Sequence, residues 1–98
     1  MLKIESQQTV NIWLDDIRPA PSGYIWCKSV KEAQNILLSK IVENMSLDHD
    51  LGTKQNGYDL VKWMAANNKW PKNKPIVHSR NPVGQTNMES VIDRYGPY

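Results

Sequence analysis

Acidic residues stand directly after two short apolar segments of this chain. Asp15 and Asp16 follow residues 10–14, and Asp48 and Asp50 follow residues 45–47. A third apolar segment, residues 75–77, leads into four polar residues: His78, Ser79, Arg80 and Asn81. Because α/β proteins bind ligands at the carboxyl edge of a parallel sheet, apolar segments that end in such residues indicate a site at that edge.

The acids predict a site for a divalent cation if their segments are neighbouring strands. Two like charges 4 Å apart repel by about 4 kcal/mol at the effective dielectric of a protein surface, so such a cluster must bind a cation, hold a proton or be spread apart. We expect Asp15, Asp16 and Asp48 to hold Mg²⁺ or Mn²⁺, which prefer oxygen ligands. The alternative is that Asp15 and Asp16 only form a solvated strand end.

Three residues near these segments are candidates for acid–base chemistry: His49, Asp50 and His78. Histidine changes its charge near neutral pH, and either His49 or Asp50 would serve as the general base. His78, at the end of an expected strand, would donate to an anion. For His49 a plain hydrogen bond to a neighbouring loop is an equally good interpretation.

The polar residues after the third apolar segment resemble an anion site. Ser79, Arg80 and Asn81 would surround an anion together with the free amides of a helix that begins there. Arg18 lies in a proline-rich loop, where its planar fork can clamp a phosphate or neutralise Asp16. Arg80 and Ser79 also have simpler interpretations, as a surface cation and a turn residue.

The apolar pattern predicts four strands and three helices that would position these residues. The strands are expected at residues 10–14, 24–28, 45–47 and 75–77. Ser29 and Glu32 match a capping box that starts the first helix, the second helix runs from Tyr58 to about residue 68, and Asn81 starts the third, which Gly96 ends. The first and third helices would bury these residues: Val30, Ala33, Ile36, Leu37 and Ile41, and Met88, Val91, Ile92 and Tyr95.

This order of elements predicts an α/β fold with three layers around a small parallel sheet of about four strands. Helices between the last three strands impose parallel, right-handed crossovers. The loop at residues 17–23 is too short for a helix. The first two strands therefore form either a hairpin or a very short crossover.

The composition is that of one ordinary globular domain over residues 1–98. A net charge of +2 does not indicate a nucleic-acid surface, and a single cysteine excludes an intramolecular disulfide and a structural zinc site. The sequence has no apolar leader and no run long enough to cross a bilayer, so we expect a cytoplasmic protein without a membrane partner. We expect Trp70 to be an exposed stacking platform and four residues to lie in the core: Trp13, Trp26, Cys27 and Trp63.

Four segments together resemble a family of receiver-like domains named for predicted cyclic-phosphate processing: LDDIRPAP, SLDHDLG, GYDLVKWM and IVHSRNPVGQTNMESVIDRYG. The resemblance runs from about Val10 to the end of the chain and implies a flavodoxin-like receiver fold. The fold would be truncated, because the fifth strand of ordinary receivers and its lysine have no counterpart here. The resemblance implies that Asp15 and Asp16 match the receiver acid pair, Asp48 the phospho-accepting position and Ser79 the fourth-strand hydroxyl.

The leading hypothesis is a metal-dependent phosphoesterase that acts on a small cyclic phosphate or cyclic nucleotide. The resemblance implies this role, which the additional His49, Asp50, His78 and Asn81 fit. One alternative is a non-catalytic module that binds a nucleotide or a protein. Another is a degenerate receiver phosphorylated on Asp48, against which the missing lysine argues. A homo-oligomer stays open as well, because a short parallel sheet has exposed edge strands.

Overall fold

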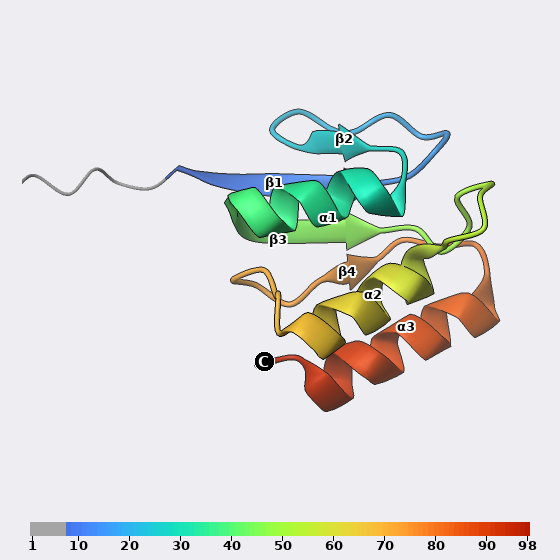
Figure 1. Ribbon diagram of the computed structural model, residues 1–98. Helices are drawn as coiled ribbons and strands as arrows, with labels where there is room; N and C mark the ends of the chain where they lie inside the picture. The colour runs from blue at the N-terminus through green and yellow to red at the C-terminus, as the bar shows by residue number, and fades with distance from the viewer. Residues whose placement is uncertain (1–7) are drawn as a thin grey trace, which may run out of the picture.

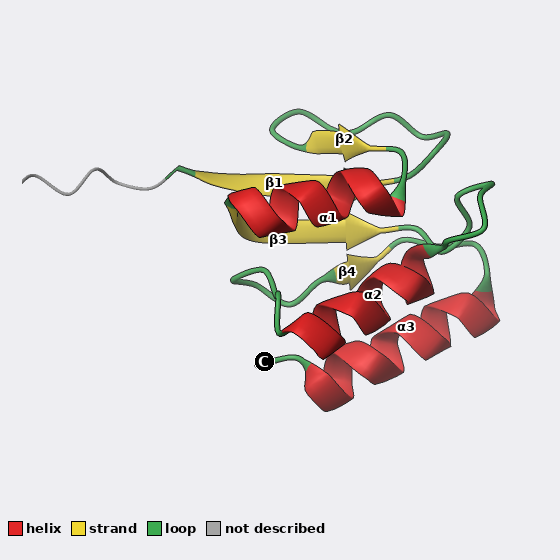
Figure 2. Ribbon diagram, viewed as in Figure 1, coloured by secondary structure: helices red, strands yellow, loops and turns green. Residues whose placement is uncertain are grey.

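Four parallel strands and three helices make up the computed structural model, which describes residues 8–98 (Figures 1 and 2). The expected single domain also included residues 1–7, which lie outside the described residues. The strands are β1 (Thr9–Leu14), β2 (Ile25–Cys27), β3 (Ile41–Leu47) and β4 (Ile76–Val77). The helices are α1 (Val30–Ser39), α2 (Gly57–Asn67) and α3 (Pro82–Tyr95). The α/β class and the parallel four-stranded sheet predicted from the sequence are confirmed.

The strands lie in the order β2-β1-β3-β4, and every neighbouring pair is parallel. The alternative of a hairpin between the first two strands is therefore wrong, and the very short crossover is right. Leu14 at the end of β1 stands opposite both Cys27 and Leu47, so the strands end level with one another. This register brings the residues that follow β1, β3 and β4 to the same edge of the sheet.

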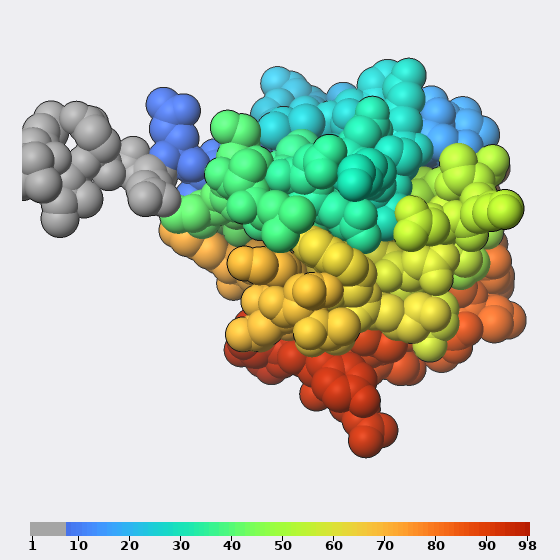
Figure 3. All heavy atoms as spheres, in the orientation of Figure 1, coloured from blue at the N-terminus to red at the C-terminus, as the bar shows by residue number. Residues whose placement is uncertain are grey.

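The structure has two layers, which corrects the expectation of three. The connections from β2 to β3 and from β3 to β4 run in the same direction across the sheet, so right-handed crossovers place α1 and α2 on the same face. Helix α3 packs against α2, and the three helices cover this face side by side (Figure 3). The connection from β1 to β2 runs the opposite way and has no helix among the described residues, so the other face of the sheet is left without a helical layer.

The core lies between the sheet and the helices. Alternate strand residues point into it, and Ile12, Leu14 and Leu47 have no exposed surface. From the helices, Leu60, Met64 and Met88 are equally buried. Burial of side chains of this size contributes about 1.5–3 kcal/mol each relative to exposure, so this layer stabilises the fold and holds the strand ends in register.

Local signals in the sequence placed the helix starts correctly. Ser29 caps α1 and forms the predicted capping box with Glu32, and Asn81 caps α3 with Pro82 in its first turn. Helix α2 begins at a second capping box, formed by Asn56 and Asp59. Side-chain oxygens at these positions accept hydrogen bonds from amides that the helix itself leaves without partners.

Some predicted burial is wrong. Ile41 begins β3 instead of extending the first helix, and it is 37% exposed. Tyr95, at the end of α3, is also exposed.

Trp26 is 37% exposed on the open face of the sheet, whereas Cys27 is buried as predicted. Trp70 is no exposed platform, because it is half-buried and packs edge-on against Tyr98. The two remaining tryptophans are half-buried: Trp13 and Trp63.

Candidate functional site

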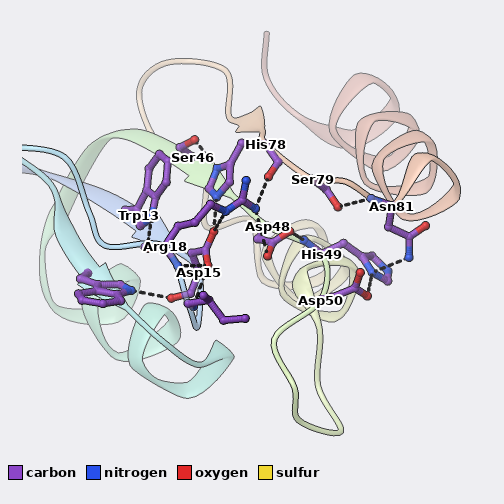
Figure 4. Close-up of polar contacts among 12 residues, drawn as sticks. Trp13, Asp15, Arg18, Ser46, Asp48, His49, Asp50, His78, Ser79 and Asn81 are labelled. Carbon is purple, nitrogen blue, oxygen red and sulfur yellow. Dashed lines mark hydrogen bonds and ion pairs between the residues drawn. The ribbon is translucent and has the colours of Figure 1, made fainter.

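Three carboxylates meet at the carboxyl edge of the sheet. Figure 4 labels two of them, Asp15 and Asp48. Asp15 and Asp16 follow β1, and Asp48 follows β3, which pairs with β1. One oxygen from each of the three carboxylates lies within 4.8 Å of the others. Two of the three side chains are buried, because Asp15 is 1% and Asp48 8% exposed. The predicted cluster is therefore present, and its repulsion must be compensated locally.

Asp15 is saturated with hydrogen-bond donors. Its Oδ1 accepts from the backbone amides of Ile17 at 2.9 Å and Arg18 at 2.8 Å. Its Oδ2 accepts from Arg18 Nε at 2.8 Å and from His78 Nε2 at 3.1 Å. An ionised carboxylate offers about four acceptor positions, so the four donors use all of them.

The Arg18 guanidinium supplies positive charge to the cluster. Besides the ion pair with Asp15, its Nη2 lies 3.5 Å from Asp48 Oδ2 and donates to the carbonyl of His78 at 3.1 Å. The side chain is 41% exposed, so it reaches the acids from the solvent side. Of the two roles predicted for Arg18, neutralisation of an acid is what the structure shows, although the acids are Asp15 and Asp48 instead of Asp16.

His78 lies between an acid and a hydroxyl. Its Nε2 faces the carboxylate of Asp15, so Nε2 carries the proton, and its Nδ1 lies 2.6 Å from Ser46 Oγ, which donates to the neutral ring. The indole of Trp13 stacks on the imidazole, with ring centroids 4.0 Å apart and an angle of 11° between the planes. Both ring nitrogens are thus engaged, and the ring is held on the open face of the sheet.

Burial and charge shift the pKa values of this pair. Burial opposes ionisation of Asp15, but its hydrogen bonds with Arg18, Ile17 and His78, and the charge of Arg18, outweigh it and lower the pKa of Asp15. Burial also lowers the pKa of His78, and the charge of Arg18 acts in the same direction against the opposing effects of Asp15 and Asp48. The site thus favours an ionised Asp15 beside a neutral His78.

Two tryptophans hold the loop that carries the acids. Trp26 Nε1 donates to the carbonyl of Asp15 at 2.6 Å, and Trp13 Nε1 donates to the carbonyl of Arg18 at 2.8 Å. Sequence analysis missed Trp13, Trp26 and Ser46 as site residues. Their contacts depend on which strands are neighbours, and the pattern along the chain does not give that order.

His49 turns away from the acid cluster toward the start of α3 (Figure 4). Its Nδ1 lies 2.8 Å from Asp50 Oδ1 and 3.4 Å from the side-chain nitrogen Nδ2 of Asn81. The ring lies against Gly84, where a Cβ would lie 2.8 Å from Nδ1 and closer still to Cγ and Cδ2. Gly84 therefore provides space for the ring of His49, which sequence analysis did not anticipate.

Ser79 and Asn81 use their side-chain oxygens to begin α3. Ser79 Oγ accepts from the amide of Asn81, and Asn81 Oδ1 accepts from the amide of Gly84, each at 3.0 Å. Two amides of the expected anion cradle are therefore already paired with these side chains. This geometry leaves the cationic part of the cradle to Arg80, which is exposed.

One pocket of about 450 Å³ collects most of the predicted residues. It is lined by four acids, two arginines and two further residues: Asp15, Asp16, Asp48, Asp50, Arg18, Arg80, Ile17 and Gly52. Four predicted residues do not line this pocket: His49, His78, Ser79 and Asn81. A pocket lined by both carboxylates and guanidinium groups suits a ligand that carries a metal ion and a phosphate together.

Comparison with known families decides the relationship. The family model for cyclic-phosphate processing receiver domains matches residues 10–94. The chain belongs to this family. No curated protein matches the chain.

The parallel sheet and its three described helices form a receiver-like α/β fold, and the resemblance stated from the sequence is confirmed. In this receiver domain none of the described helices is both long and apolar enough to cross a membrane.

The donor set of this receiver domain fits a divalent cation. All three clustered groups are carboxylates, which are the ligands that Mg²⁺ and Mn²⁺ prefer. Asp48 Oδ2 has no hydrogen-bond donor among the described residues, and its nearest cation is Arg18 Nη2 at 3.5 Å. Gly52 adopts a positive φ of 66°, and a Cβ there would lie 3.1 Å from Asp16 Oδ2, so the backbone leaves room beside that oxygen. We infer that Asp16 and Asp48 have oxygens available to a cation.

Proposed function

We propose that this domain is a divalent-metal-dependent phosphoesterase that acts on a small cyclic phosphate or cyclic nucleotide. The observation that carries the proposal is the placement of the Asp15, Asp16 and Asp48 oxygens within 4.8 Å of one another, in a pocket that also exposes Arg18 and Arg80. Membership of the family for cyclic-phosphate processing receiver domains supports the same ligand class.

The acidic residues would bind the metal ion, and the arginines would bind the phosphate. Asp15, Asp16 and Asp48 would hold Mg²⁺ or Mn²⁺, which when bound polarises a phosphoryl oxygen and lowers the pKa of a water. Arg18 and Arg80 would hold phosphate oxygens through charge-assisted hydrogen bonds. Asp50 lines the pocket and is paired with His49, so these two would accept the proton of the attacking water.

The test is an incubation of the protein with 2′,3′-cyclic and 3′,5′-cyclic nucleotides in the presence of Mn²⁺. We expect turnover of at least one compound, with a loss of roughly 100-fold or more in Asp48→Asn, because the variant removes a charged ligand of the cation that would stabilise the reacting phosphate. Asp93→Asn is the matched control, because Asp93 pairs with Lys74 and does not line the pocket. Absence of turnover for the whole panel, with the fold intact by circular dichroism, removes the proposal that the domain is an enzyme.

A second candidate is a module that binds a nucleotide without converting it. The engagement of both His78 nitrogens favours this candidate, because that ring is not free to move a proton. The candidate predicts that a cyclic nucleotide raises the melting temperature and is recovered unchanged from the protein by chromatography. Recovery of an opened product would exclude it.

A further inference from the structure

Arg18 contacts carboxylate oxygens of Asp15 and Asp48 that a metal ion would also bind. Arg18 Nε occupies Asp15 Oδ2 at 2.8 Å, and Arg18 Nη2 is the cation next to Asp48 Oδ2 at 3.5 Å. Because four donors already saturate Asp15, it cannot ligate a metal directly until one of them leaves. The question is which donor is the least firmly held.

The contacts of the four donors single out the Arg18 side chain. The two backbone amides are fixed by the turn at residues 15–18. His78 is held from three sides, by Asp15, Ser46 and the stacked ring of Trp13, and its side chain is only 16% exposed. The Arg18 side chain is 41% exposed and borders the open pocket. Its backbone is tied separately by Trp13, so the guanidinium can move while the loop stays in place.

We propose that Arg18 is the pocket's own counter-cation, that it competes with a divalent cation for Asp15 and Asp48, and that the displaced guanidinium turns to the phosphate group of the ligand. This inference rests on the proposed function, since it assumes that the acids hold a metal. It adds an order of binding, in which the divalent cation comes first. Before that step the fork of Arg18 is occupied, and the pocket presents four carboxylates to an approaching anion.

Charge balance supports the exchange. The cluster contains three carboxylates, those of Asp15, Asp16 and Asp48, and Arg18 compensates only one negative charge. A divalent cation at the same oxygens brings more charge at shorter range, so the guanidinium is the weaker competitor for the carboxylates. Once free, a planar fork beside a metal-bound phosphate can form two parallel hydrogen bonds to its oxygens.

The first experiment uses the unmodified protein. Arginine side-chain Nε–H signals are recorded by ¹H–¹⁵N NMR, and the Arg18 signal is assigned by its loss in Arg18→Gln. We expect Mg²⁺ alone to shift the Arg18 signal and to speed its exchange with water, because the hydrogen bond to Asp15 is lost. We expect inorganic phosphate, added after Mg²⁺, to shift it again. If Mg²⁺ binds and leaves the Arg18 signal in place, the inference is overturned.

The second experiment compares Arg18→Gln with Arg80→Gln by calorimetric titration at constant ionic strength. Both variants remove one positive charge from the same pocket, but Arg80 has no ion pair within 4.0 Å among the described residues. We expect Arg18→Gln to bind Mg²⁺ on the order of tenfold more tightly than the unmodified protein, and Arg80→Gln to gain less than about threefold because its effect is only screened and long-range. With saturating Mg²⁺, we expect both variants to bind inorganic phosphate about tenfold less tightly.

The outcomes separate this inference from the proposed function. Equal Mg²⁺ affinity in Arg18→Gln and Arg80→Gln overturns the competition while leaving a metal site in place. Phosphate affinity unchanged in Arg18→Gln overturns the transfer of the fork to the phosphate. If none of the three proteins binds Mg²⁺ or Mn²⁺, the metal-dependent function fails and this inference fails with it.

Discussion

A single buried carboxylate organises the site at the scale of residues. Asp15 joins its own turn, the guanidinium of Arg18 and the imidazole of His78, which lies 63 positions away in the sequence. Without this acid, Nε2 of the largely buried His78 ring would lose its acceptor, at a cost of about 1–3 kcal/mol. Asp15 therefore contributes to positioning as much as to any role in holding a cation.

The pKa shifts of this pair predict how stability depends on pH. Burial lowers the pKa of His78 below its ordinary 6.5, so the folded protein binds fewer protons at this site than the unfolded chain. The stabilising contribution is therefore complete above pH 6.5 and is lost as the pH falls through the lowered pKa of His78. Asp15, with a lowered pKa as well, loses its contribution only at more acidic pH, below its ordinary 3.8.

Urea denaturation in the presence of a chelator checks this dependence. We expect the free energy of unfolding to decrease from pH 7 to pH 5 in the unmodified protein. His78→Gln should flatten that decrease, and His49→Gln, which alters the chain's other histidine, should keep it. An unchanged slope in His78→Gln would show that another group is responsible.

At the scale of elements, the approach of α3 to the end of β3 depends on one glycine. Gly84 lies in the first turn of α3, and the ring of His49 occupies the space that a Cβ would need. Replacement by alanine normally stabilises a helix by about 1 kcal/mol, whereas overpacking costs about 1–3 kcal/mol. We expect Gly84→Ala to destabilise the protein because the clash is the larger effect.

A double-mutant cycle with His49→Ala isolates the clash. In that background the ring is absent, so Gly84→Ala should stabilise the protein by up to about 1 kcal/mol. Urea denaturation of the four proteins measures both signs. A loss of stability that persists without the ring would assign the cost to the backbone of α3 instead of to His49.

Local signals predicted the elements well and their surroundings less well. The capping box of Ser29 and Glu32 and the apolar spacing of Met88 and Ile92 are properties of residues close in the sequence, and they predicted α1 and α3 correctly. The start of β3 at Ile41 was missed because the four residues before Met45 lack a clean alternation. The stacking of His78 on Trp13 could not be predicted from the sequence, because it depends on the strand order and on a sheet face that none of the described helices covers.

The candidate site was predicted unevenly for the same reason. Acids at strand ends were placed together, since all parallel strands end at one edge. The partner of Arg18 was not predictable, because several acids were within reach of its long side chain. The roles of Asp50, Arg80 and the other predicted residues in catalysis or binding stay predictions.

At the scale of the whole molecule, stability depends on the core between the sheet and the three described helices, which cover one face of the sheet. Helix α3 closes this core at the edge beside β4, a strand of only two residues. Ile92 is 1% exposed there, whereas Tyr95 on the same helix is 57% exposed. A chain of this size has only about 5–15 kcal/mol of stability in total, so a loss at α3 affects the whole domain.

Ile92→Ala is the corresponding test. We expect a loss of about 2–5 kcal/mol and a melting temperature lower by at least about 10 °C, because the substitution leaves a cavity under α3. Tyr95→Ala should cost less than about 1 kcal/mol, since it removes little buried surface. Thermal unfolding followed by circular dichroism compares them. Similar effects for the two variants would mean that α3 is not part of the cooperative core.

The buried position of Cys27, the single cysteine of the chain, allows its reactivity to report local unfolding. Burial, together with the charge of Glu32, raises the pKa of Cys27 to about 11, so at neutral pH the folded chain presents almost no reactive thiolate. An alkylating reagent would then modify the chain only when the strand that carries Cys27 separates from its neighbours. The rate of modification, followed by mass spectrometry without any denaturant, would report how often this strand opens.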